Sequence, residues 1–196
     1  MNTKTKGIIR KIIYFILIGF CIYGFIYIGN KYTNNGEDKV PTIEDYYENT
    51  KYKHYEVVGG TELINLLRKG NNVIYIGNSS NKWSIKYIEE LDKIFKNYDI
   101  DKVYYYDIVN DKSQKNSNYY KIISLLDGHL VSNDSGDNNL LSPSLYIIND
   151  GEVLYYNIDT VIVKNNTEVN DYWTQDKEAL FEVEISHALL NYYLNN

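Results

Sequence analysis

The stretch NNVIYIGNSSNKWSIKYIEE, residues 71–90, decides the expected organisation of this chain. Four apolar residues in a row, Val73 to Ile76, predict a short buried strand that ends at Gly77. The polar turn NSSN follows, and apolar residues then recur at helical spacing up to about Tyr98. A strand that leads through a polar turn into a helix presents unpaired backbone N–H groups and the positive end of the helix dipole. We therefore expect the functional site between Gly77 and Ser84.

Outward from this stretch, predicted strands and helices alternate. The predicted strands cover residues 55–58, 73–76, 103–108, 145–148 and 153–158, and the predicted helices cover 61–69, 83–98, 119–126 and 175–194. Thr61 is the expected N-cap of the first helix, and Tyr120, Ile123 and Leu126 form the expected apolar face of the third. The tight turn NDGE at residues 149–152 joins the last two strands as a hairpin. This order predicts an α/β fold with a mixed central sheet flanked by helices.

The connecting segments are polar. Residues 109–118 and 132–139 read as surface loops, and residues 159–174 read as irregular structure that Trp173 anchors. Residues 30–54 have no sustained period and are predicted to be a polar spacer in front of a domain at residues 55–196.

The N-terminus has the pattern of a membrane anchor. Residues 1–11 carry four basic residues and no acid, and residues 12–29 are uncharged and almost wholly apolar. A membrane helix takes roughly 17–25 residues, so this segment is long enough to span a bilayer. We predict a single-pass protein of the cell membrane with a cytoplasmic basic tail and an exterior C-terminal domain. A cleaved signal peptide is the alternative, but no A-x-A-like site follows the apolar run. Cys21 is expected to be an apolar residue of the membrane helix rather than a lipid attachment site.

Charge excludes one class of partner. The chain has 196 residues and a net charge of −6, of which the first 29 residues contribute +4 and the remainder −10. An acidic exterior domain is a poor binder of nucleic acid, because phosphate contacts need clustered Lys and Arg. The domain also contains no cysteine, so it cannot form an internal disulfide.

Three motifs give the chain a resemblance to the thioredoxin-like superfamily. They are the strand–loop–helix VIYIGNSSNKWS, the tripeptide Ser142-Pro143-Ser144 before the strand LYII, and the hairpin turn NDGEV. Within the superfamily the chain is similar to the small bacteriocin-accessory thioredoxin-like proteins of Gram-positive bacteria. The resemblance covers roughly residues 55–195 and implies a thioredoxin-like fold with a cis-proline at Pro143.

The resemblance fails at the reactive residues. In this family the strand ends in Gly, three residues follow, and a C-x-x-C pair begins at the fourth position. The equivalent positions here are Asn81 and Ser84, in the sequence Asn81-Lys82-Trp83-Ser84. Thiol–disulfide exchange needs a thiolate to attack and a second thiol to resolve the mixed disulfide. A serine hydroxyl is far less acidic than a thiol, so Ser84 cannot replace either cysteine. The chain is therefore expected to be redox-inactive and to have no catalytic residue of this kind.

Other chemistries have weaker signals. Ser79, Ser80 and Ser84 lie in no G-x-S-x-G motif, and the three histidines, His54, His129 and His187, are expected to be surface or interior residues without a catalytic role. No His/Cys cluster has metal-ligand spacing, and the acidic residues 134–137 lack the spacing of a calcium loop, so we expect neither a metal nor a cofactor. Asp107, at the end of a central strand, could be partly buried.

Without thiol chemistry, the function that the resemblance still implies is peptide binding. The resemblance implies a groove between the loop before the second helix and the proline loop, in which an extended peptide is held by backbone hydrogen bonds. The residues expected to line it are Ser79, Ser80, Lys82, Trp83, Ser142, Pro143 and Ser144. Trp83 supplies apolar area that is common in binding hot spots, although it could equally pack into the core.

The favoured hypothesis is thus a non-catalytic binding or chaperone-like accessory whose partner is a secreted peptide such as a bacteriocin, or a membrane protein. Two alternatives stay open. The first is an oxidoreductase family member by descent that is inactive or takes thiols from a partner. The second is a structural surface protein whose interface lies elsewhere, for example on residues 159–174.

Overall fold

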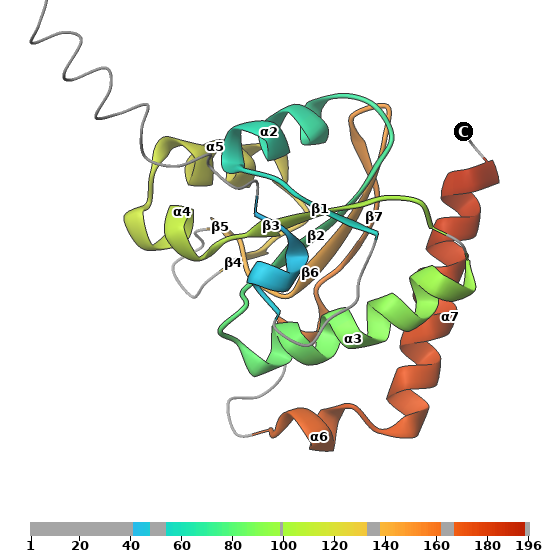
Figure 1. Ribbon diagram of the computed structural model, residues 1–196. Coiled ribbons are helices and arrows are strands. Elements are labelled where there is room, and N and C mark those ends of the chain that lie inside the picture. Colours follow the sequence, from blue (N-terminus) through green and yellow to red (C-terminus); the bar gives the residue numbers. More distant parts are fainter. Residues whose placement is uncertain (1–40, 48–53, 99, 133–137, 162–166, 195–196) are drawn as a thin grey trace, which may run out of the picture. The chain divides into compact units, whose positions relative to one another are not determined.

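The computed structural model describes residues 41–47, 54–98, 100–132, 138–161 and 167–194. They belong to one compact unit, Pro41–Asn196. Figure 1 shows a central twisted sheet with α2 and α5 on one face and α3 and α7 on the other. The predicted α/β fold with a mixed sheet flanked by helices is therefore confirmed.

Five strands form the sheet in the order β1-β3-β2-β6-β7. The strands are β1 (Tyr55–Val57), β2 (Asn72–Gly77), β3 (Val103–Asp107), β6 (Ser144–Asn149) and β7 (Glu152–Asn157). The first three run parallel to one another, whereas β6 and β7 are antiparallel to their neighbours. The carboxyl ends of β1, β2 and β3 consequently lie at one edge of the sheet.

Alternation along the central strands divides the core into two layers. In β2, Val73 and Tyr75 face α3 and α7, while Ile74 and Ile76 face α2 and α5. The strand is buried on both faces because helices cover both, which explains its continuous apolar run.

The helices follow the apolar periodicity. They are α2 (Gly60–Arg68), α3 (Lys82–Asn97), α5 (Ser117–Leu125) and α7 (Gln175–Leu194), with the shorter α4 (Val109–Gln114) and α6 (Val169–Tyr172) and the 3-10 turns η1 (Ile43–Asp45) and η2 (Asp159–Val161). The bounds of α7 agree with the prediction. In α2 the N-cap is Gly59 rather than Thr61, because the helix begins two residues earlier than predicted.

The predicted hairpin joins β6 to β7. Asp150 and Gly151 have φ angles of 50° and 80°, which is the left-handed pair that a tight hairpin turn requires. A Cβ on Gly151 would lie 2.6 Å from the carbonyl oxygen of Arg68, so close packing as well as conformation calls for glycine there.

Two predicted loops contain regular structure. Residues 109–118 form α4 and the start of α5, with Asn116 capping α5 through the backbone N–H of Tyr119. The predicted loop 132–139 is flanked by the short paired strands β4 (Val131–Ser132) and β5 (Asn138–Asn139), while residues 133–137 lie outside the described residues. The sequence did not reveal these short elements, because their residues are mostly polar and bury no continuous apolar face.

The apolar face predicted for α5 is right at Leu126, which is buried, and wrong at Tyr120, which is 56% exposed. Ile123 is half-buried, whereas its neighbour Ile122 and Tyr119 are buried. Two adjacent tyrosines and two adjacent isoleucines give the sequence two equally apolar faces, so periodicity alone could not choose between them.

The predicted spacer begins the fold instead of preceding it. Ile43 and Tyr47 are 2% and 4% exposed and belong to the core layer beneath α3 and α7. The start of the domain at residue 55 is therefore wrong, and the compact unit starts at Pro41. The short motif Ile43…Tyr47 is too brief to produce a periodic signal in a polar stretch.

The predicted tail at residues 1–11 and the predicted anchor at 12–29 lie outside the described residues. Within the part of the chain that the structure describes, no helix is both long and apolar enough to cross a membrane.

Candidate functional site

The loop between β2 and α3 is built by its own polar side chains. Asn81 is the N-cap of α3, and its Oδ1 accepts a hydrogen bond of 2.9 Å from the backbone N–H of Trp83. Ser84, three residues later, is fully buried, and its Oγ accepts from the N–H of Asn78 at 3.2 Å. Asn78 in turn accepts from the N–H of Ser80. Asn81 and Ser84 thus close the first turn of the helix.

Asp107 anchors the same loop from the neighbouring strand. One carboxylate oxygen accepts from the N–H of Ser79 at 3.1 Å and from the hydroxyl of Tyr105 at 2.9 Å. The other oxygen accepts from the N–H of Val109 at 2.9 Å. The sequence suggested that Asp107 is partly buried, and it is half-buried, but its role in fixing the loop was not predicted.

Tyrosines pack tightly below the loop. A Cβ on Gly77 would lie 2.8 Å from the Tyr47 hydroxyl and 2.8 Å from the Tyr105 ring, so only glycine fits where β2 ends. The Tyr75 hydroxyl donates to the carbonyl oxygen of Ser84 at 2.9 Å. Burial raises the pKa of Tyr47 to about 12, and burial also raises the pKa values of Tyr75 and Tyr105 well above the ordinary value for tyrosine. These hydroxyls are neutral structural groups rather than acids or bases at physiological pH.

The register of β2 and β6 brings the proline loop to this edge of the sheet. Ile76 pairs with Ser144, so Pro143, which directly precedes β6, lies at the edge of the sheet where β2 ends at Gly77. The peptide bond between Ser142 and Pro143 is cis. Pro143 and Ser144 are buried, Ser142 is half-buried, and the Ser144 hydroxyl donates to the carbonyl oxygen of Leu141 at 3.0 Å.

The outer side of the loop is more accessible. Trp83 is half-buried and makes an edge-to-face contact with Tyr172 of α6, with ring centroids 5.5 Å apart. Lys82 is exposed and pairs with Glu168 at 2.5 Å. A cleft of about 310 Å³ lies beside them and is lined in part by Lys82, Ile85 and Val169. Trp83 therefore packs against the core with one part of its ring and borders the accessible surface with another.

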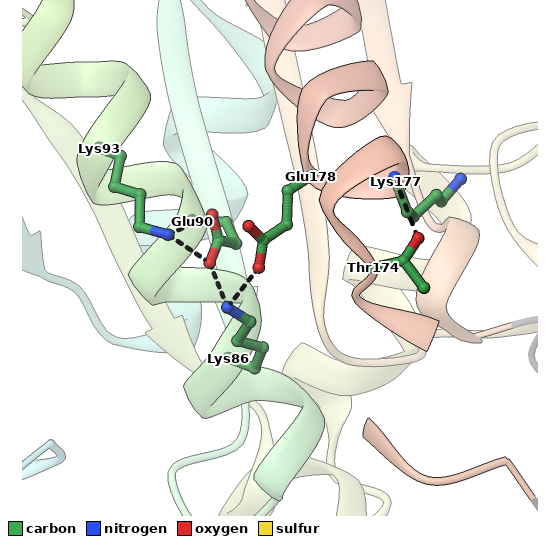
Figure 2. A network of polar contacts seen from close by, with 6 residues as sticks. All are labelled: Lys86, Glu90, Lys93, Thr174, Lys177 and Glu178. Atoms are coloured by element: carbon green, nitrogen blue, oxygen red, sulfur yellow. Dashed lines mark hydrogen bonds and ion pairs between the residues drawn. The ribbon is translucent and has the colours of Figure 1, made fainter. Parts of the chain in front are cut away.

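A network of ion pairs holds α3 against α7. Figure 2 shows Lys86 between Glu90 of its own helix and Glu178 of α7, with Lys93 on the far side of Glu90. Lys86 lies 2.8 Å from Glu178, and Lys93 lies 2.7 Å from Glu90, which is only 5% exposed. The hydrogen bond from Lys86 holds the pKa of Glu178 below its ordinary value. This network stabilises the helix pair that supports the site.

The remaining candidate residues are scattered. His54 is half-buried at the start of β1, His129 is half-buried against the ring of Tyr156, and His187 is exposed on α7. Trp173, the expected anchor, is buried against Tyr87 and Phe181. Among the described residues, no group of three or more His, Cys, Asp or Glu side chains could hold a metal ion.

A comparison with protein-family models found no match to this chain, and a comparison with curated proteins found none either.

Proposed function

We propose that this chain is a thioredoxin-like protein without thiol chemistry, which binds an extended peptide at the carboxyl edge of its sheet. The observed order of elements, βαβαβ, helices, a hairpin and a closing helix, supports the resemblance. So do the mixed sheet and the cis bond before Pro143. The observation that carries the proposal is the pairing of Ile76 with Ser144, because it brings the two predicted halves of the groove to one edge of the sheet.

The hydrogen bonds of Asn81 and Ser84 favour binding over catalysis. Asn81 caps α3, and buried Ser84 fixes the N–H of Asn78, so both side chains serve the loop. The residues at the positions proposed for the reactive pair therefore hold the loop without supplying a nucleophile. The full chain should show no reduction of insulin disulfides above background, since residues 30–196 contain no sulfhydryl group.

A peptide would be held mainly through its backbone. The proline loop ends in the antiparallel strand β6, and the loop 78–81 carries exposed Ser80 beside half-buried Ser79. Backbone hydrogen bonds supply affinity in such extended binding, and neighbouring side chains supply specificity. Trp83 and Lys82 are the side chains placed to do so, one with apolar area and the other with charge.

The proposed setting is the outer surface of the cell membrane. The apolar segment 12–29 acts as the anchor and the basic tail stays in the cytoplasm. The partner is then a secreted peptide, such as a bacteriocin, or another membrane protein.

Site-specific photocrosslinking in intact cells tests the proposal. A photoreactive residue replaces Ser80, which is exposed on the loop, and in a second strain it replaces Lys121, which is exposed on α5. The proposal predicts a discrete crosslinked product at position 80 that is absent at position 121 and weakened by Trp83→Ala. Equal patterns at both positions would overturn peptide binding at this edge.

A further inference from the structure

Helix α7 has two apolar faces. One face, with Phe181, Ile185 and Leu189, is buried in the core. On another face, Leu180, Val183, Leu190 and Leu194 are 48%, 66%, 50% and 74% exposed. In the described part of the chain, no other element carries as many exposed large apolar side chains. Surface helices usually place polar residues toward water, so an exposed second apolar face is typical of an interaction surface.

The spacing on this face is that of a helix–helix seam. Leu180, Val183, His187, Leu190 and Leu194 follow one another at intervals of three, four, three and four residues, and all five are exposed. We call these five residues the outer seam. Apolar residues at alternating intervals of three and four form the contact line of paired helices, in which each side chain inserts between side chains of the facing helix. The outer seam is two heptads long and therefore fits a second helix of about the same length.

Charge along α7 favours one direction for a pair of these helices. The N-terminal half carries four acids, Asp176, Glu178, Glu182 and Glu184, and one base, Lys177, whereas residues 185–194 contain no Asp, Glu, Lys or Arg. A parallel pair of these helices would bring the two acidic halves together. An antiparallel pair places each acidic half beside the uncharged half of the other copy and also opposes the two helix dipoles. An anionic membrane surface is disfavoured by the same acidic residues.

We infer that α7 forms an antiparallel contact with α7 of a second copy of this chain, through the outer seam. A two-fold axis near the middle of the helix makes the contact self-complementary, as in most homodimers. Four or five side chains from each copy bury less area than the roughly 1,200–2,000 Å² of a stable interface, so the pair is a weak, concentration-dependent dimer. This inference does not depend on the proposed peptide site, which lies at the carboxyl edge of the sheet.

Disulfide crosslinking between two differently tagged full-length copies tests it, with Cys21 replaced by Ser in both. One copy carries Leu180→Cys and the other Leu194→Cys. At about 1.5 Å per residue, an antiparallel pair brings these two positions within about 6 Å but separates each from its own counterpart by about 15 Å or more. We expect the mixed pair to crosslink severalfold more than either matched pair. Glu182→Cys, which is exposed on α7 but lies off the outer seam, is the control.

The variant Val183→Asp with Leu190→Asp should abolish the crosslink and shift sedimentation toward the monomer. Both side chains are at least half exposed, so circular dichroism should show an unchanged fold. Tyr120→Asp, at an exposed apolar position on α5, should leave the crosslink intact. Preferential crosslinking of matched positions would overturn the antiparallel arrangement. The absence of any crosslink between copies would overturn the dimer and leave a membrane, another protein or residues 1–40 as the cover.

Discussion

At the residue scale, Asn81 fixes the start of α3. Its side chain caps α3 through the N–H of Trp83. We predict that Asn81→Ala lowers the free energy of unfolding by about 0.5–2 kcal/mol, because it leaves this N–H without its partner. Asn81→Asp, which keeps the capping oxygen, should lose little. Urea unfolding followed by circular dichroism measures both, and equal losses for the two variants would contradict the capping role.

Gly77 shows how tightly the tyrosines pack under the loop. A Cβ there would meet the Tyr47 hydroxyl and the Tyr105 ring at 2.8 Å each. We predict that Gly77→Ala costs about 1–3 kcal/mol of stability through overpacking. Adding Tyr47→Phe removes one of the two clashing atoms and should make the alanine less costly.

Gly59→Ala is the matched control, because nothing lies within 4 Å of a Cβ at that position. It should cost less than about 1 kcal/mol in the same urea titration. If Gly77→Ala were as mild as Gly59→Ala, the packing described around Tyr47 and Tyr105 would be wrong.

At the element scale, the sequence predicted most of what buries a continuous apolar face. The strands β2 and β6 carry continuous apolar runs, and the helices α3 and α7 carry apolar residues at helical spacing, so the sequence pattern located all four. The helix α4 was missed because, in the structure, it buries none of its side chains. The ion-pair network around Lys86 could not be predicted from the sequence either, because its members lie in residues 86–93 and at Glu178, far apart in the chain. Such long-range pairs leave no local pattern.

The contact between α3 and α7 gives a pH-dependent prediction. Lys86 lowers the pKa of Glu178 below its ordinary value of 4.5. The ion pair therefore stabilises the fold at neutral pH, and this contribution is lost as the pH falls below 4.5 through the lowered value. Glu178→Gln should cost less than about 1 kcal/mol at neutral pH, because both side chains are partly exposed and solvent screens the pair.

The difference between wild type and Glu178→Gln should shrink as the pH falls below 4.5, and it should vanish once the carboxylate is protonated in both folded and unfolded chains. Urea midpoints measured across this range are the test, and Glu182→Gln, at an exposed position on the same helix, is the control. A difference that stayed constant from neutral pH to acid would show that the loss is not electrostatic.

At the scale of the whole molecule, the segment before β1 is part of the fold. Ile43 and Tyr47 lie in the core, next to the tyrosines that support the loop. We predict that Ile43→Ala costs about 2–5 kcal/mol in the full chain, as expected for a buried aliphatic side chain. Ile85→Ala makes the same change at a position that is 40% exposed and should cost much less. Thermal and urea unfolding measure the stability loss of both variants. Similar losses would show that residues 41–47 are a spacer and not part of the core.

The placement of the candidate site was only partly predictable. The motif around residues 77–84 and the proline loop could be read from the sequence, because local turn chemistry marks them. The contributions of Asp107 and Tyr47 could not, since they depend on strand order and on a segment that joins the core from outside the periodic pattern. The outer seam was visible as apolar residues of the last helix, but only the structure separates them from the buried face.

The central claim is that this molecule keeps the frame of a thiol oxidoreductase without its two sulfur atoms. The most direct measurement is the redox behaviour of Asn81→Cys with Ser84→Cys, in a full chain whose only native cysteine, Cys21, is replaced by Ser. The control pair is Lys121→Cys with Ser124→Cys, which has the same spacing at two exposed positions in the interior of α5. The claim predicts that the pair at 81 and 84 forms a reversible disulfide in a glutathione buffer while the control pair does not. Two thiols at 81 and 84 that react independently, as in the control, would contradict it.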